Sequence, residues 1–315
     1  MEKNDRAVVE RKRKDQGLHE CEVYGGGSDD LEGNQSWQAC EKNPGHACFI
    51  PYTDFRREHL PEAWQTQDVW SQVVDVAERT VKLRVGYTSM ERPEGYAFYN
   101  HRGTSLVHTG SGWIEHVISR TDVPCPCTDC DRSVSPHTGF WFEVNVITAC
   151  HVVYNAEEAK STRVDVHYDA KTSRREGTMQ TIWAYDVIKS GAVEDACVLV
   201  CAAHELYNVQ LSFPLKVRVL PTPDLKVTRD DPCIVISHPH GSPKQVTVGE
   251  VRQADRSHPE GLITYSADTC PGTSGAPVLC LYSEGSRTVT QSSVHSKGGV
   301  ADGHNQGSCV FIKLE

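Results

Sequence analysis

The chain has 315 residues, a hydrophobic fraction of 38% and a formal net charge of −10 at pH 7. The charge argues against a nucleic-acid partner, because binding to phosphates is driven by clustered Lys and Arg. No apolar run approaches the roughly 20 residues of a membrane span, and the charged N-terminus lacks the apolar core of a secretory signal. We therefore expect an intracellular, cytoplasmic protein without a membrane partner, in which most of the 13 cysteines are free thiols.

Residues 1–62 are polar, show no sustained hydrophobic period and contain a glycine run at residues 25–27. We expect a largely disordered extension here. The basic run at residues 11–14 has the composition of a nuclear-localisation or partner-docking patch. Acidic neighbours interrupt this run, which favours a solvated tail.

The next region, residues 63–105, is expected to form a helix and a strand that pack on the body of the protein. Apolar residues recur there at three- and four-residue intervals, which predicts a helix over about residues 66–80: Val69, Trp70, Val73, Val74, Ala77 and Val81. Alternation of apolar and charged residues predicts a strand at 81–85.

From residue 106 the pattern changes to short alternating segments broken by Gly, Pro, Asp and Ser, which predicts an all-β architecture of antiparallel strands. The first set of predicted strands is 111–120, 139–149, 163–168, 179–187 and 196–201. A linker is expected near 204–212. The second set is 214–220, 232–237, 245–252, 261–267, 276–282, 288–294 and 308–313.

Two groups of residues have some features of zinc sites. The first has three thiols within six residues, with His137 as a candidate fourth ligand: Cys125, Cys127 and Cys130. Zinc there would staple an inserted loop, and without zinc these are surface thiols. The second group makes only half a site and lacks a matching second pair: Cys40, His46 and Cys48. We expect no cofactor.

The stretch 268–279 carries the clearest chemistry, because it places Ser274 between glycines and ahead of an apolar strand. Gly272 and Gly275 can take backbone angles that a side chain would forbid. Such a turn exposes one hydroxyl beside the backbone N–H groups of residues 272 and 274. Two converging N–H groups can stabilise a developing oxyanion, each by roughly 3–4 kcal/mol.

With two further segments, this stretch resembles the chymotrypsin-like serine proteases. Thr-Ala-Cys-His at residues 148–151 resembles the motif that ends in the family's general base, and Glu-Asp-Ala at 194–196 resembles the strand that supplies its aspartate. The resemblance implies a triad of His151, Asp195 and Ser274, an oxyanion hole formed by the N–H groups of Gly272 and Ser274, and two six-stranded barrels with the site between them. In this arrangement residues 106–205 form the first barrel and residues 206–315 the second.

Other aspartates in the first half compete with Asp195 as the orienting carboxylate: Asp165, Asp169 and Asp186. Thr273 stands where zymogen-activated relatives carry an aspartate, so activation by a new N-terminal amine is not expected. Thr-Gly-Ser-Gly-Trp-Ile at 109–114 resembles instead the branch of HtrA proteases and glutamyl endopeptidases. In that branch, the segment with His238 and His240 resembles a loop that supports the substrate pocket, although two histidines also resemble metal ligands by type.

The residues expected in the substrate pocket give conflicting signals: Asp268, Thr269, His295, Ser296 and Gly298. Asp268 lies six residues before the nucleophile, where trypsin binds Lys or Arg. His295 lies in a segment that resembles the pocket wall of glutamyl endopeptidases, where the histidine reads Glu or Gln. An aspartate beside His295 would favour the charged imidazole. We favour Glu or Gln, while Lys or Arg and a small residue remain open.

The sequence thus predicts a serine endopeptidase that acts on a protein or peptide substrate through an acyl-enzyme. One alternative is a catalytically silent peptide-binding module on the same fold. All three triad residues are present, which favours the enzyme. An esterase that uses the same triad is a further alternative.

Overall fold

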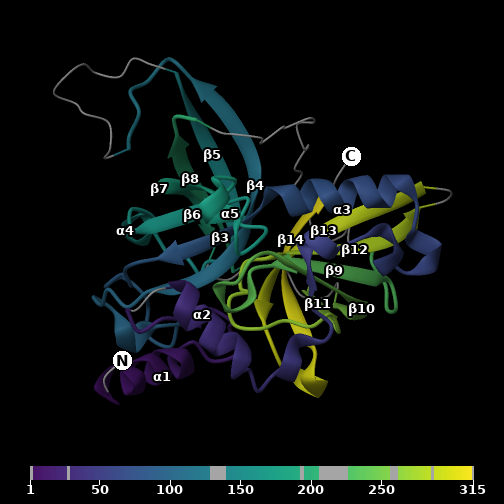
Figure 1. The fold of residues 1–315 in the computed structure, drawn as a ribbon, viewed down its shortest axis with the longest axis horizontal. Helices are drawn as coiled ribbons and strands as arrows, with labels where there is room; N and C mark the ends of the chain where they lie inside the picture. The colour runs from purple at the N-terminus through teal and green to yellow at the C-terminus, as the bar shows by residue number, and fades with distance from the viewer. Residues whose placement is uncertain are drawn as a thin grey trace.

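The computed structural model describes residues 3–26, 29–127, 140–191, 195–205, 226–255, 262–284 and 287–313. Two antiparallel β-barrels make up its body (Figure 1). The five α-helices in the described residues are α1 (Lys3–Asp15), α2 (Asp29–Gln38), α3 (Gln67–Arg79), α4 (Ala156–Ala159) and α5 (Ser173–Glu176). The 3₁₀ helices of the described residues are η1 (Pro44–His46), η2 (Tyr52–Asp54), η3 (Arg57–His59), η4 (Glu62–Trp64), η5 (Tyr99–His101), η7 (Pro239–Gly241) and η8 (Ala301–Gly303).

The first barrel has the strand order β4-β3-β6-β7-β8-β5 and is closed by pairing of β4 with β5. Its strands are β3 (Thr80–Val85), β4 (His108–Arg120), β5 (Trp141–Thr148), β6 (Thr162–Val166), β7 (Gln180–Gly191) and β8 (Ala196–Ala203). Apolar side chains of these strands fill the barrel, among them Leu83, Val146 and Leu199. A two-residue strand from the N-terminal region, β1 (Glu22–Val23), pairs with the start of β4.

The second barrel has the order β11-β14-β13-β12-β9-β10 and is closed by pairing of β10 with β11. Its strands are β9 (Pro232–Ser237), β10 (Gln245–Asp255), β11 (Leu262–Tyr265), β12 (Pro277–Glu284), β13 (Arg287–Lys297) and β14 (Asn305–Lys313). The short strand β2 (Ile50–Pro51) adds to β10. The sequence prediction of two six-stranded antiparallel barrels is confirmed.

Helix α3 lies against the second barrel, near β13 (Figure 1). Its buried face includes Val69, Val73 and Ala77, which share one apolar cluster with residues of β9 and β12. Burial of each such valine stabilises the fold by about 1.5–3 kcal/mol. Thr66 caps the helix, since its side chain accepts a hydrogen bond from the Val69 N–H. The structure agrees with the predicted helix to within one residue at each end.

Two predictions about the first third of the chain need correction. Strand β3 belongs to the first barrel, between β4 and β6, so that barrel does not begin at residue 106. Residues 3–26 and 29–62 are not a disordered extension, because they form helices and bury side chains such as Cys21, Val23 and Tyr24. These contacts are with distant parts of the chain, and local periodicity carries no signal for them. The predicted strand at 214–220 lies outside the described residues, as do Cys130 and His137.

Within the part of the chain that the structure describes, no helix has both the length and the apolar character needed to cross a membrane.

Candidate active site

The predicted triad residues lie together at the junction of the two barrels. His151 follows β5, Asp195 precedes β8 and Ser274 precedes β12. The His151 Nδ1 atom is 2.8 Å from Asp195 Oδ2, and His151 Nε2 is 2.6 Å from Ser274 Oγ. A neutral histidine whose Nδ1–H donates to Asp195 leaves Nε2 free to accept the Ser274 proton. Asp165, Asp169 and Asp186, the alternative candidates for the orienting carboxylate, take no part in these two contacts.

The glycines beside Ser274 are required by the close approach of other backbone segments. Gly272 has φ of 99°, and a Cβ there would lie 2.5 Å from the His238 carbonyl oxygen. Gly275 has φ of 84°, and its Cβ would lie 2.2 Å from Thr148 Oγ1. Both angles fall in the region that favours glycine. The turn that presents Ser274 therefore depends on both glycines.

Neighbouring groups hold His151 and Asp195 in place. The Ser296 hydroxyl donates to Asp195 Oδ2 at 2.5 Å, and the His151 N–H donates to Asp195 Oδ1 at 3.0 Å. The Arg92 guanidinium donates to the His151 carbonyl at 3.1 Å and forms a buried ion pair with Glu158. Both the ring and the backbone of His151 are thus fixed.

Burial and pairing act in opposite directions on the ionisation of the triad. Burial alone lowers the pKa of His151, but the charge of Asp195 and its hydrogen bond outweigh this and raise the pKa to about 9. Burial raises the pKa of Asp195, yet the charge and hydrogen bond of His151 lower it to about 2. The pair therefore favours the ionised carboxylate and strengthens the base.

A segment of the N-terminal region occupies the cleft beside Ser274. The Glu20 carbonyl oxygen accepts hydrogen bonds from the N–H groups of Gly272 at 2.6 Å and Ser274 at 3.2 Å. The Glu20 N–H donates to Ser274 Oγ at 2.9 Å. The Gly298 N–H donates to the Leu18 carbonyl at 2.9 Å. This segment contacts the two backbone N–H groups that the sequence analysis predicted to form an oxyanion hole.

The Glu20 side chain enters a buried pocket in the second barrel. His295 Nε2 lies 2.9 Å from one carboxylate oxygen, and Lys42 Nζ lies 2.5 Å from the other. The Tyr265 hydroxyl is 2.5 Å from His295 Nδ1. Because that hydroxyl can donate to Nδ1, the neutral ring carries its proton on Nε2 and donates it to Glu20. A side chain at Gly298 would not fit, since its Cβ would lie 2.3 Å from Glu20 Cδ.

The charges in this pocket suit a carboxylate. Burial raises the pKa of Glu20, but the hydrogen bond from His295 and the charge of Lys42 outweigh it and lower the pKa to about 2. Burial is also the largest influence on His295 and lowers its pKa despite the carboxylate. The pocket therefore holds an ionised glutamate with one neutral donor and one cation.

The chain continues past the cleft on the side of the first barrel. Gln16 accepts a hydrogen bond from the Cys21 N–H at 2.8 Å and donates to the Cys21 carbonyl at 2.9 Å. Glu22 and Val23 then pair with Thr109 and His108 at the start of β4. On the other side of Glu20, the His19 ring stacks on His151 with centroids 3.9 Å apart. The segment is thus held on both sides of the Glu20–Cys21 bond.

Of the five residues predicted in the pocket, four contact this segment or its partners. His295 and Gly298 border Glu20. The Ser296 carbonyl accepts a hydrogen bond from His19 Nδ1 at 2.8 Å, and the Thr269 hydroxyl accepts one from Lys42 at 2.8 Å. Asp268 is different, because its carboxylate forms a hydrogen bond with the Cys48 thiol and raises the pKa of that thiol. The two ring nitrogens of His295 have Tyr265 and Glu20 as partners, so the envisaged pair of His295 with Asp268 is not present.

Two groups in the pocket were missed by the sequence analysis, namely Glu20 and Lys42. Both lie in the part of the chain expected to be disordered. Neither belongs to a recognisable motif, and each is more than 220 residues from its partner in the second barrel. Only the folded chain brings them to the site.

Comparisons with known proteins agree with this architecture. The family model described as the trypsin-like peptidase domain matches residues 137–285. The matched segment is similar to trypsin-like peptidase domains, and the two antiparallel barrels agree with this similarity.

Solved structures similar to the chain include the active form of the Rv3671c protease from M. tuberculosis, with 17% identity, a TM-score of 0.38 and coverage of 77% of this chain and 78% of that one. An HtrA-type protease, AlgW, with a decapeptide has 16% identity, a TM-score of 0.40 and coverage of 78% and 62%. Deg5 has 14% identity, a TM-score of 0.37 and coverage of 68% and 81%. No curated protein sequence matches the chain.

Proposed function

We propose that this protein is a serine endopeptidase that cuts peptide bonds after glutamate. The observation that carries this proposal is the position of Glu20. Its carbonyl accepts from two backbone N–H groups beside Ser274, while its carboxylate contacts His295 and Lys42 in the adjoining pocket. The contacts of this one residue support both the proposed position of the scissile carbonyl and the proposed preference of the pocket.

In the proposed mechanism, Ser274 Oγ attacks the carbonyl carbon of the substrate while His151 Nε2 takes its proton. The N–H groups of Gly272 and Ser274 stabilise the oxyanion, and Asp195 stabilises the imidazolium. His151 then protonates the leaving amine, which leaves an ester on Ser274. Water hydrolyses this ester with His151 as the base, and a peptide with a C-terminal glutamate departs.

The pocket explains why glutamate is preferred to its neutral or basic analogues. A glutamine would lose the ion pair with Lys42, whose side chain is one third exposed, and a lysine or arginine would place two cations together. A hydrogen bond to a charged group is worth about 1.5–3 kcal/mol. A substrate that retains both hydrogen bonds is therefore expected to react roughly 10²-fold faster or more than one that loses them.

The test uses full-length Glu20→Ala protein, in which the occupant of the pocket loses its carboxylate. Peptides that differ only in having Glu, Gln, Lys or Ala at the cleaved bond are assayed by mass spectrometry. Cleavage after Glu that is fastest of the four, and absent in the Glu20→Ala/Ser274→Ala control, supports the proposal. Absence of cleavage with a folded Glu20→Ala protein that binds the Glu peptide would favour a silent peptide-binding module.

A further inference from the structure

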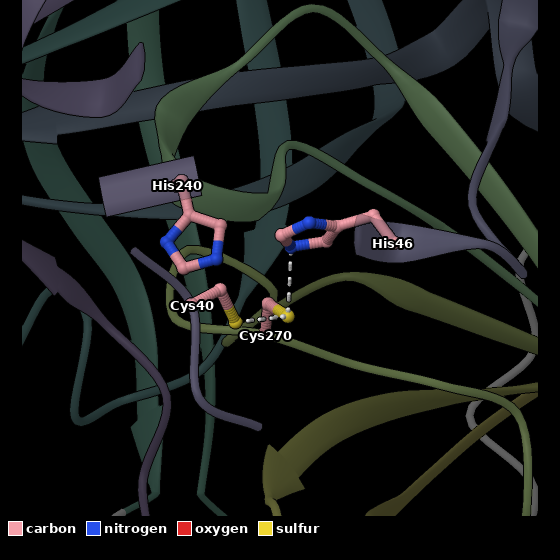
Figure 2. Close-up of side chains that lie close together, drawn as sticks. All are labelled: Cys40, His46, His240 and Cys270. Carbon is pink, nitrogen blue, oxygen red and sulfur yellow. Dashed lines mark hydrogen bonds between the residues drawn. The ribbon is translucent and has the colours of Figure 1, made fainter. Parts of the chain in front are cut away.

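A cluster of two cysteines and two histidines includes one residue, Cys270, of the turn that presents Ser274, which we call the catalytic turn (residues 270–275). Figure 2 shows the four side chains. Cys40 and His46 come from the N-terminal region, while His240 and Cys270 come from two loops of the second barrel. The four ligand atoms all lie within 4.8 Å of one another. The Cys40 and Cys270 sulfurs are 3.6 Å apart, and Cys270 Sγ is 3.5 Å from His46 Nε2.

These separations are close to those of a tetrahedral zinc site. With Zn–S bonds of about 2.3 Å and Zn–N bonds of about 2.0–2.1 Å, a tetrahedral angle places two sulfurs about 3.8 Å apart and a sulfur and a nitrogen about 3.6 Å apart. Two thiolates and two imidazoles are a ligand set that selects zinc over magnesium or calcium. The cluster supplies all four ligands, as structural zinc sites do.

The surroundings of the four residues provide independent support. The Nε2 atom of His240 is buried without a hydrogen-bond partner among the described atoms. Its other nitrogen, Nδ1, is 2.7 Å from a carboxylate oxygen of Glu22, which is the arrangement that orients a metal-binding histidine. The Asn43 side chain donates to Cys270 Sγ at 3.1 Å, and its backbone N–H donates to Cys40 Sγ at 3.5 Å. Both sulfurs thus accept a hydrogen bond from Asn43.

We propose that Cys40, His46, His240 and Cys270 bind a structural zinc ion that joins the N-terminal region to the catalytic turn. Cys270 lies two residues before Gly272, and the His240 N–H donates to the Pro271 carbonyl at 2.5 Å. The ion would therefore fix the turn that carries Gly272 and Ser274. It would also hold residues 40–46, and with them Lys42, against the substrate pocket.

Metal content of purified full-length protein, measured by inductively coupled plasma mass spectrometry, tests this proposal. The wild type and the matched control Cys48→Ser are expected to contain one zinc more than Cys40→Ser or His46→Ala. A Cys125→Ser/Cys127→Ser variant accounts for metal at the other cluster, where both sulfurs lie within 3.4 Å of His204 Nε2. Cobalt(II) substitution of the wild type should give the absorption bands of tetrahedral thiolate coordination even if a ligand variant does not fold. Zinc content that is equal in the wild type and a folded Cys40→Ser protein, or a Cys40–Cys270 disulfide in the native protein, would overturn it.

A different set of contacts, those of residues 18–23, carries a second inference, which rests on the proposed function. We infer that the Glu20–Cys21 bond is cleaved by the same molecule's Ser274. The Glu20 carbonyl is held by the N–H groups of residues 272 and 274, and the Glu20 side chain fills the pocket. Intramolecular presentation of this kind replaces a bimolecular encounter and gives a high effective concentration of the bond.

The cleavage follows the proposed mechanism with water as co-reactant. Ser274 Oγ forms an ester with the Glu20 carbonyl carbon, the bond to the Cys21 nitrogen breaks, and this nitrogen takes a proton from His151. Water then hydrolyses the ester, which restores the Ser274 hydroxyl and leaves a carboxylate on Glu20 and an amine on Cys21. Residues 1–20 become a separate peptide.

The peptide of residues 1–20 is expected to stay bound to the rest of the protein after the cut. The Lys12 amine is fully buried and donates to Thr88 Oγ1 at 3.0 Å and to the Leu106 carbonyl at 2.5 Å. Arg13 pairs with Glu22, and Gln16 bonds to both backbone groups of Cys21. These contacts connect the two products directly. Detection of the cut therefore requires denaturing conditions.

Intact mass measured under denaturing conditions tests this inference on freshly purified full-length protein. The wild type should yield a chain that begins at Cys21 and a 20-residue peptide, whereas Ser274→Ala should remain intact and Glu20→Gln should be cut at least tenfold more slowly. The rate should not depend on protein concentration. An uncut wild type would overturn self-cleavage. If the wild type is uncut but Glu20→Ala still cuts the Glu peptide, self-cleavage fails and the proposed endopeptidase function remains. If Glu20→Ala does not cut the peptide either, self-cleavage and the endopeptidase function both fail.

Discussion

The triad and the segment that lies on it are packed together, yet they are encoded in different ways. Each triad residue sits in a short motif next to a strand, and its neighbours in sequence explain its position. Glu20 has no such motif, and its pocket partner His295 is 275 residues away in the sequence. The proposed catalytic groups are thus specified locally. The proposed selectivity depends instead on the docking of a remote segment.

Removal of the proposed nucleophile should have the largest effect on the rate of peptide cleavage. In a Glu20→Ala background, Ser274→Ala is expected to lower kcat for a Glu-containing peptide by about 10⁶-fold, since the acyl-enzyme cannot form. Initial rates measured with excess peptide test this. Circular dichroism serves as the control for folding. Residual activity within tenfold of the parent would mean that another residue is the nucleophile.

Replacement of the orienting carboxylate should have the next largest effect. Asp195→Asn, again with Glu20→Ala, is expected to lower kcat about 10⁴-fold, because the amide stabilises the wrong tautomer of His151 and not its cation. Asp186→Asn is the matched control and should leave the rate unchanged. A strong loss in the control and none in Asp195→Asn would transfer the role to the other aspartate.

Changes in the pocket should affect selectivity more than the chemical step. Lys42→Met is expected to reduce the preference for Glu over Gln by about 10²-fold, mainly by lowering kcat/KM for Glu, because a buried carboxylate loses its cation. The same peptides used for the parent give this ratio. Unchanged preference in Lys42→Met would show that His295 alone selects the side chain.

The pH dependence of self-cleavage follows from the ionisation of His151. Burial lowers its pKa, but the charge and hydrogen bond of Asp195 and the contact with Cys21 raise it to about 9, and only the neutral ring can act as base. The rate should therefore rise about tenfold per pH unit below pH 9 and level off above it. Denaturing mass spectrometry of samples quenched after jumps from low pH gives this profile. A rate that is constant between pH 6 and 9 would contradict the assignment.

The sequence predicted the fold and the three residues that lie together between the barrels, because alternating strands and short motifs are local features. It placed β3 outside the first barrel, since the pairing of β3 with β4 and β6 is a long-range property. It assigned His240 to a loop and found only half of a zinc site near Cys40. The other half, His240 and Cys270, is about 200 residues further along the chain. Nothing in the local pattern predicts that these halves meet.

We propose that Ser274 is an activated nucleophile covered by the chain's own Glu20. Labelling with a fluorophosphonate probe, followed by mass spectrometry of the adduct, tests it most directly. We expect rapid labelling of Ser274 in Glu20→Ala, slow labelling in the wild type and no labelling in Glu20→Ala/His151→Ala. Equal labelling of the first two would contradict the covering role of Glu20, and no adduct on folded Glu20→Ala would contradict the activated nucleophile.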